Sequence, residues 1–160
     1  MSIFKYLKDL LFPTTGLFMV SSGPSAIPGN HFFGIYLNNP SGSKKQIYIS
    51  RIIAGGNSNV SITLIRNGTF AGGTPLIPYN ANFGSAKTPA ATVKLITQST
   101  DPFAGSAPFS TVIQSDGSIV IDDNGRATLP PNSSLGIRIE NNTPQPNLLS
   151  ATISWWEQKY

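Results

Sequence analysis

The feature that most constrains the fold is a series of short apolar runs, separated by turn residues, that begins at residue 31. Apolar and polar residues alternate through Leu135–Glu140, and Leu149–Trp155 repeats the pattern. A period of two is typical of a strand with one buried face. No stretch of helical periodicity separates the runs, so the sequence contains no βαβ units and the strands should pair antiparallel.

Nine segments qualify as strands, because clusters of Gly, Pro, Asn, Asp and Ser bound them. They are His31–Leu37, Gln46–Ala54, Asn59–Arg66, Thr92–Thr97, Phe109–Gln114, Ser118–Asp122, Arg126–Leu129, Leu135–Glu140 and Leu149–Trp155. Many short strands with regular turn signals predict an all-β fold, namely an antiparallel two-sheet sandwich with jelly-roll-like strand order.

Three turn pairs make more local predictions. Asn67-Gly68 favours a type I′ hairpin, because both residues tolerate positive φ. Asp116-Gly117 and Asn124-Gly125 join three successive strands, so they predict a three-stranded meander over residues 109–129.

The first thirty residues differ from the remainder. Residues 2–12 place apolar side chains on one face of a short amphipathic helix, which Ser2 can cap and Pro13 ends. Residues 13–30 are rich in Pro, Gly, Ser and Thr and predict an extended arm. We therefore divide the chain into an N-terminal helix and arm (1–30) and a β-sandwich domain (31–160).

A helix this short is marginal in water, so its apolar face must dock on the chain's own domain, a sister subunit or a membrane surface. We expect protein contact rather than membrane contact. The two tryptophans lie on opposite faces of one strand. Trp155 belongs to the inward row and is expected in the core, whereas Trp156 faces the other way and is expected to contact a neighbouring subunit. The predicted subunit-interface residues are Ile3, Phe4, Leu7, Leu10, Leu11, Phe12 and Trp156.

Charged residues make up 11% of the chain, against about 25% in typical proteins. The basic residues are scattered, so the clustered cations that nucleic-acid binding requires are missing, and no nucleic-acid partner is expected. Low charge also removes the repulsion that keeps proteins monomeric. The composition thus favours a homo-oligomer that assembles with further copies or other assembly proteins.

The N-terminus does not resemble a secretory signal, because Lys5, Lys8 and Asp9 interrupt its apolar run. No run of residues approaches the length of a membrane span. We expect synthesis in the cytosol, with a final location in a virion or in a cell-surface or spore-surface assembly.

The sequence offers little for catalysis or for holding a metal or cofactor. His31 is its one imidazole, and it contains no cysteine. Asp122-Asp123-Asn124 lacks the spaced oxygen ligands of a calcium loop, and Glu140 lies on the solvent face of its strand. Without a nucleophile–base pair, paired cleft carboxylates or a phosphate-binding glycine loop, we predict no enzymatic activity, no cofactor and no metal.

Several segments together resemble small jelly-roll structural proteins of bacteriophage virions and related bacterial surface assemblies. The similarity covers about 120 residues, roughly 37–157, and rests on Leu37–Gly42, Asn67-Gly68, Leu129–Leu135 and Ile153–Glu157. It implies a virion component (capsid, decoration, fibre or tail) and no catalytic residues.

The sequence therefore predicts a non-enzymatic structural protein that self-assembles, in a phage particle, with its N-terminal arm mediating attachment. One alternative is a subunit of a bacterial surface or spore filament. Another is a carbohydrate-binding module that stacks sugars on Trp155, Trp156 or Tyr79, so a glycan partner stays open. A third is a membrane-docking protein that uses residues 2–12.

Overall fold

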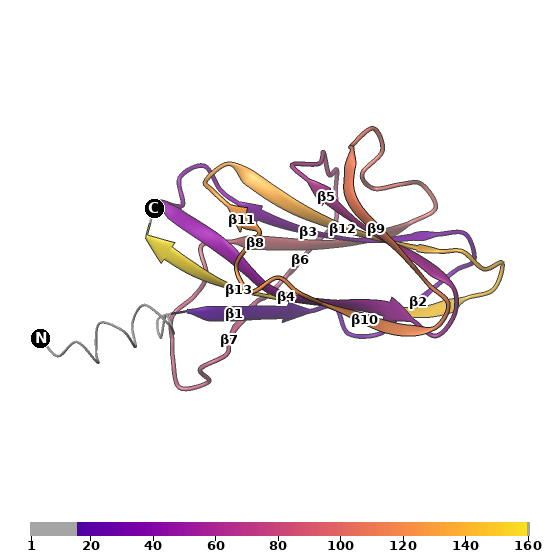
Figure 1. The fold of residues 1–160 in the computed structure, drawn as a ribbon, viewed down its shortest axis with the longest axis horizontal. Helices are drawn as coiled ribbons and strands as arrows, with labels where there is room; N and C mark the ends of the chain where they lie inside the picture. The colour runs from indigo at the N-terminus through magenta and orange to yellow at the C-terminus, as the bar shows by residue number, and fades with distance from the viewer. Residues whose placement is uncertain (1–15, 160) are drawn as a thin grey trace, which may run out of the picture.

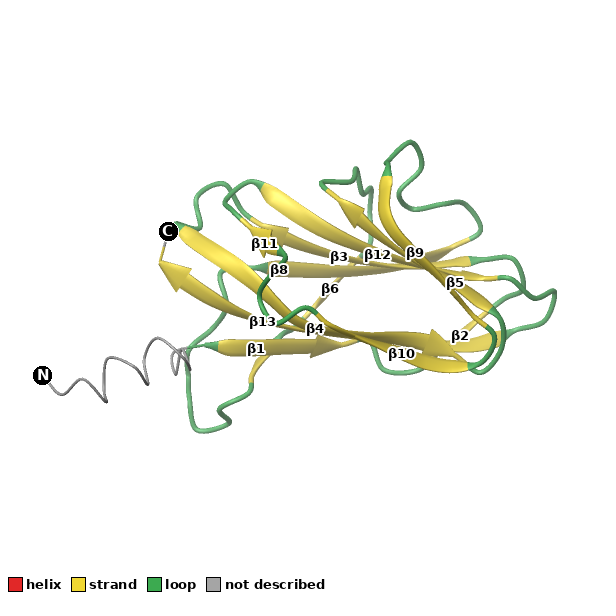
Figure 2. Ribbon diagram, in the orientation of Figure 1, coloured by secondary structure: helices red, strands yellow, loops and turns green. Residues whose placement is uncertain are grey.

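The computed structural model describes residues 16–159, which form two antiparallel β-sheets packed face to face (Figure 1; Figure 2). No helix occurs among these residues. The strands are β1 (Leu17–Ser21), β2 (Ser25–Ile27), β3 (Phe32–Asn39), β4 (Lys45–Gly56), β5 (Val60–Arg66), β6 (Thr74–Leu76), β7 (Tyr79–Asn80), β8 (Thr92–Gln98), β9 (Pro108–Gln114), β10 (Gly117–Asp122), β11 (Thr128–Leu129), β12 (Ser133–Asn141) and β13 (Asn147–Lys159). The predicted all-β, antiparallel two-sheet sandwich is confirmed.

The two sheets, here named A and B, differ in strand order. Sheet A runs β10-β4-β13-β1-β7, with β11 also paired to β4 and β2 also paired to β13. Sheet B runs β6-β8-β3-β12-β5-β9. The long strands β4 and β13 lie beside each other in sheet A, and β3 and β12 lie beside each other in sheet B. Every pairing is antiparallel, as expected of a chain without crossover helices.

The core lies between the sheets and is built from the alternating rows that the sequence predicts. In β13 the side chains of Leu149, Ala151, Ile153 and Trp155 point inward and are at most 1% exposed. The inward row of β12 consists of Leu135, Ile137 and Ile139. These two rows, from opposite sheets, belong to one continuous apolar cluster.

All nine predicted strands are present, with bounds that shift at their ends. The last predicted strand grows to Asn147–Lys159, and Arg126–Leu129 shrinks to Thr128–Leu129. Two short strands, β1 and β2, were missed. Residues 71–91, whose Gly and Pro residues predict a long irregular connection with short strand pieces, contain the short strands β6 and β7.

The prediction of an arm was wrong for residues 17–27, which belong to the sandwich. β1 pairs along its whole length with β13, and β2 pairs with the start of β13. Phe18 and Val20 are buried between exposed neighbours, and the ring centroid of Phe18 lies 6.1 Å from that of Trp155. The predicted helix over residues 2–12 lies outside the described residues.

The predicted meander and hairpin were also wrong. β9 pairs with β5 in sheet B, whereas β10 pairs with β4 in sheet A, so the Asp116-Gly117 turn carries the chain from one sheet to the other. Asn67 does adopt a positive φ of 50°, but it caps β5 against β12 and donates its backbone N–H to Ser134. A turn pair supplies the backbone conformation for a reversal and does not determine the partner of the next strand.

Candidate functional site

The carboxylates of three aspartates, Asp101, Asp122 and Asp123, are held by nearby donors. Arg51 pairs with Asp122 across β4 and β10, and Arg138 pairs with Asp101. Asp123 accepts a hydrogen bond from the backbone N–H of Ala127. The predicted Asp122-Asp123 cluster therefore serves a turn. Among residues 16–159, no group of three His, Asp or Glu side chains is placed to hold a metal ion.

Two other ionisable residues, His31 and Glu157, have local structural roles. His31 hydrogen-bonds through Nδ1 to the carbonyl oxygen of Gly29 at 2.9 Å, just before β3. Glu157 is only 7% exposed, although the sequence gives no signal for its burial. Its carboxylate accepts hydrogen bonds from the backbone N–H groups of Ala90 and Ala91, and Trp155 Nε1 donates to it at 3.2 Å. Glu157 thereby fixes the loop before β8 onto sheet A.

Loops of the chain cover the outer face of sheet B over β3 and β12, whereas Ile113 on the edge strand β9 of the same sheet is 71% exposed. Phe70 stacks on Tyr36 with ring centroids 5.1 Å apart, and Phe103 packs against Phe70 at 5.0 Å. Both phenylalanines come from loops that cross this face. Two glycines make room for them: a Cβ at Gly136 would lie 2.4 Å from Phe103, and one at Gly34 would lie 3.3 Å from Phe70. This side of the sandwich carries its own small apolar cluster.

In the described part of the chain, the outer face of sheet A carries one stacked aromatic pair, Tyr48 with Trp156. Directly paired residues of neighbouring strands share a face, so strand register gives its composition. Exposed apolar side chains stand on β1, β7, β10 and β13, and they are Leu17, Met19, Tyr79, Val120 and Leu148. Small neutral side chains lie between them, and they are Ser21, Ser118, Ser150, Thr152 and Ser154.

Charge is scarce on this face. Among the strand residues that point outward from sheet A, the charged ones are Arg51 and Asp122, which pair with each other. The face is therefore electrically neutral and mostly apolar or weakly polar. Neither the apolar residues of β1 nor the pairing of β10 with β4 was predicted from the sequence.

A shallow groove of about 270 Å³ runs along the middle of this face. Its floor is formed by the small side chains of Thr152 and Ser154 on β13. One wall comes from β1 and the other from β4, and the wall residues are Leu17, Met19, Ser50, Arg51 and Ile53. The alternation of small and large side chains on neighbouring strands creates this relief.

Trp156, predicted to contact another subunit, lies on the same outer face of sheet A. Its indole stacks on Tyr48 with centroids 5.7 Å apart and an interplanar angle of 6°. A Cβ at Gly125 would lie 2.5 Å from the indole, so the turn before β11 also contacts it. Trp156 is half-buried by its own chain and borders the face. The other predicted interface residues, Ile3, Phe4, Leu7, Leu10, Leu11 and Phe12, lie outside the described residues.

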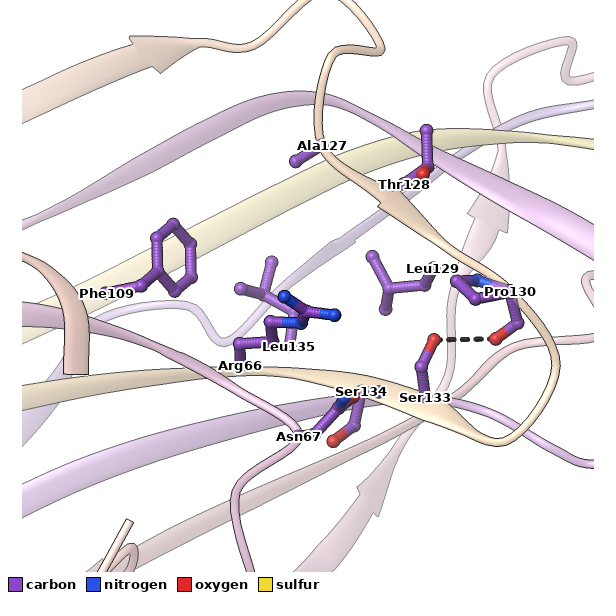
Figure 3. Close-up of a pocket in the computed structure, with 10 residues that line it drawn as sticks. All are labelled: Arg66, Asn67, Phe109, Ala127, Thr128, Leu129, Pro130, Ser133, Ser134 and Leu135. Carbon is purple, nitrogen blue, oxygen red and sulfur yellow. Dashed lines mark hydrogen bonds between the residues drawn. The ribbon is translucent and has the colours of Figure 1, made fainter. Parts of the chain in front are cut away.

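A separate cleft of about 450 Å³ opens between β11 and the ends of β5, β9 and β12 (Figure 3). In it Arg66 lies between Phe109 and Leu129, and the Ser133 hydroxyl donates to the carbonyl of Pro130 at 2.6 Å. Its ten lining residues include no Asp, Glu or His. The cleft therefore brings no acid–base pair together.

Comparison of the chain with protein-family models, with curated proteins and with solved structures gave no match. No helix among the described residues is long and apolar enough to cross a membrane.

Proposed function

We propose that the protein is a non-enzymatic structural protein that self-assembles, and that it does so as a component of a bacteriophage virion. The single observation that carries this proposal is the difference between the two outer faces. Loops with Phe70 and Phe103 cover the part of sheet B formed by β3 and β12, whereas sheet A presents several exposed apolar side chains and one neutral ion pair. Uncovered apolar faces mark interaction surfaces in soluble proteins.

The energetics favour burial of the sheet A face. Fully burying a side chain such as Met19, Val120 or Leu17 stabilises by about 1.5–3 kcal/mol. Association itself costs about 4–15 kcal/mol of free energy. The burial of these side chains offsets that cost only if the interface is broad enough to cover several of them. The face spans several neighbouring strands and carries few charges to desolvate, which meets this requirement.

The strand order supports a jelly roll as the finer description of the sandwich. A jelly roll arises when a long antiparallel ribbon is wrapped, so its strand pairs are nested, first with last. Here the nested pairs are β1 with β13, β3 with β12, β4 with β10, and β5 with β9. Viral capsid domains commonly use this architecture. Because fold analogy alone assigns no function, the virion role depends on the assembly itself.

The segment before β1 is proposed to extend the assembly. Residues 2–12 carry the predicted apolar stripe, and they precede a strand that lies on the uncovered sheet. We propose cytosolic synthesis followed by incorporation into the particle. A bacterial surface or spore filament would use the same surfaces, and imaging of native particles separates these two origins.

Sedimentation velocity of the full chain over a concentration series tests the proposal. We expect association well below about 100 µM, the dissociation constant of a contact worth about −5.5 kcal/mol. A variant that lacks residues 1–15 should form smaller species, while its sandwich stays folded because β1 is kept. A full chain that stays monomeric at every concentration contradicts the proposal.

A further inference from the structure

We propose that a second copy of this chain pairs with the outer edge of β10, the last strand of sheet A, in an antiparallel twofold contact centred on Val120. This inference rests on the proposed self-assembly and specifies one of its contacts. Sheet A would continue without a break from one copy into the other. The outer face that carries Val120 would double in width, and a broad face is what its burial requires.

β10 is the long edge strand that lacks protection against pairing in the described part of the chain. Proteins protect edge strands by shortness, proline, bulges or charge. The strands β2, β6, β7 and β11 have only two or three residues each. β9 has seven residues, but it begins with Pro108 and its register with β5 shifts next to that residue. β10 has six residues, is apolar over residues 119–121 and carries its one charge at its last residue, Asp122.

The N–H and C=O groups of alternate residues in β10 point away from β4, because an antiparallel ladder bonds at every second residue. Just after β10, the backbone N–H of Asp123 donates to Ser50 at 3.0 Å. The carbonyl of Asp122 therefore faces the other side, where the guanidinium of Arg126 donates to it at 3.1 Å. A carbonyl oxygen has two lone pairs, so it can still accept a bond from a partner strand. The outward positions of β10 are Ser118, Val120 and Asp122. Among residues 16–159, no strand other than β4 pairs with β10.

A twofold centred on Val120 satisfies these outward groups and matches the side chains. Val120 then faces its own counterpart, and Ser118 faces Asp122 of the second copy, so each of these residues exchanges an N–H and a C=O across the contact. On the inner side Ile119 faces Ile121, twice by symmetry. Both isoleucines are half-buried and pack against the core of their own copy. Because β-branched side chains pack well against neighbours in a sheet, the contact extends the core from one copy to the other.

The two neighbouring registers bring charge into conflict. Centring the twofold on Ile119 sets Asp122 opposite Asp116 of the second copy, and like charges directly opposite each other destabilise a sheet. Centring it on Ile121 sets the carboxylate of Asp122 opposite the apolar side chain of Val120. A slip of one strand by a single residue would turn the apolar rows to opposite faces. The register centred on Val120 is thus the one that β10 specifies for its own second copy.

The ends of this contact are complementary in charge, which favours a second copy over an unrelated strand. Asp116, just before β10, comes level with Asn124 of the second copy. The turn with Asn124 also holds Arg126, whose guanidinium lies along the same edge through its bonds to the carbonyls of Asp122 and Asp123. Asp116 and Arg126 are both exposed. By symmetry an acidic and a basic residue therefore meet at both ends of the contact.

Opposite charges placed at the centre of the contact test it in the full chain. Val120 is 55% exposed, so the sandwich tolerates a charge there. Val120→Lys alone and Val120→Glu alone should each weaken association about tenfold or more, because each sets like charges opposite each other. An equimolar mixture of the two variants should recover association, since lysine then faces glutamate. Ile113→Lys is the matched control, because Ile113 is 71% exposed on the edge strand β9 of sheet B. It should leave association unchanged.

A second pair of variants separates the edge of β10 from the outer face of sheet A. Val120→Pro keeps an apolar side chain on the face but removes an N–H that points away from β4, and edge strands accept proline at such positions. It should weaken association, whereas Val120→Ile, which keeps the N–H, should not.

Weight-average mass from sedimentation equilibrium gives the readout, and thermal unfolding checks that each variant is folded. If the wild type associates and every Val120 variant does so equally well, the inference fails while the proposed function stands. If the two charged variants dissociate and their mixture does not recover, or if Val120→Pro associates like the wild type, the twofold centred on Val120 fails. A monomeric wild type refutes both the inference and the proposed function.

Discussion

Replacing Gly136 by alanine tests the covered face of sheet B. Gly136 lies on β12 beneath the ring of Phe103, and the added Cβ would lie 2.4 Å from Phe103 Cε1 and 2.6 Å from Cζ. Phe103 is 1% exposed and packed against Phe70, so its ring has no free space into which it can move. Either the ring or the loop that carries it must shift.

The expected cost follows from the size of this clash. Overpacking a filled apolar site costs typically about 1–3 kcal/mol. For a chain of this length each kcal/mol lowers the melting temperature by about 2–4 °C, so a fall of roughly 2–12 °C is expected. Gly42 is the matched control, since a Cβ there meets nothing within 4 Å. Neither glycine has a positive φ, so backbone strain does not enter the comparison.

Urea unfolding and thermal melts of Gly136→Ala, Gly42→Ala and the wild type give the result. The exposed substitution should change the free energy of unfolding by no more than about 0.5 kcal/mol. If the two variants behave alike, Phe103 does not cover β12 in solution. The contrast between the two outer faces, on which the proposed function depends, would then be lost.

Three further variants address single sites. Glu157→Gln should lower the free energy of unfolding by about 1.5–3 kcal/mol, since an amide replaces a buried carboxylate that accepts from Ala90 and Ala91; urea unfolding measures this. Asn141→Leu should cost at least about 2 kcal/mol in the same assay, because its buried amide donates to three carbonyls, including that of Ile27. Trp156→Ala should bind a glycan array no differently from the wild type. If the wild type binds a glycan and the variant does not, the carbohydrate-binding alternative is favoured.

Much of the fold follows from the sequence because alternation is a local property. The rows of β12 and β13 were predicted residue by residue, since each strand has one face in the core. β1 was missed although Phe18 and Val20 alternate with exposed residues, because Leu17 and Met19 on the other face are also apolar. When both faces of a strand are apolar and turn residues lie nearby, the sequence shows no clear alternation of apolar and polar residues.

The candidate site could not be derived in the same way, because it depends on which strands become neighbours. Val120 and Met19 share a face only because β10, β4, β13 and β1 are adjacent in sheet A. The Asp116-Gly117 turn suggests a hairpin, yet the core requires β9 and β10 in different sheets. Similarly, the burial of Glu157 depends on the N–H groups of a loop 66 and 67 residues away in the chain.

The most direct test of self-assembly through sheet A is the rate at which Met19 is oxidised to its sulfoxide, measured by peptide mass spectrometry at increasing protein concentration. Met19 is 39% exposed in the single chain, and oxidation requires access to its sulfur. The rate is expected to fall as copies associate and cover the face. A rate that stays constant while the protein assembles would contradict self-assembly through sheet A.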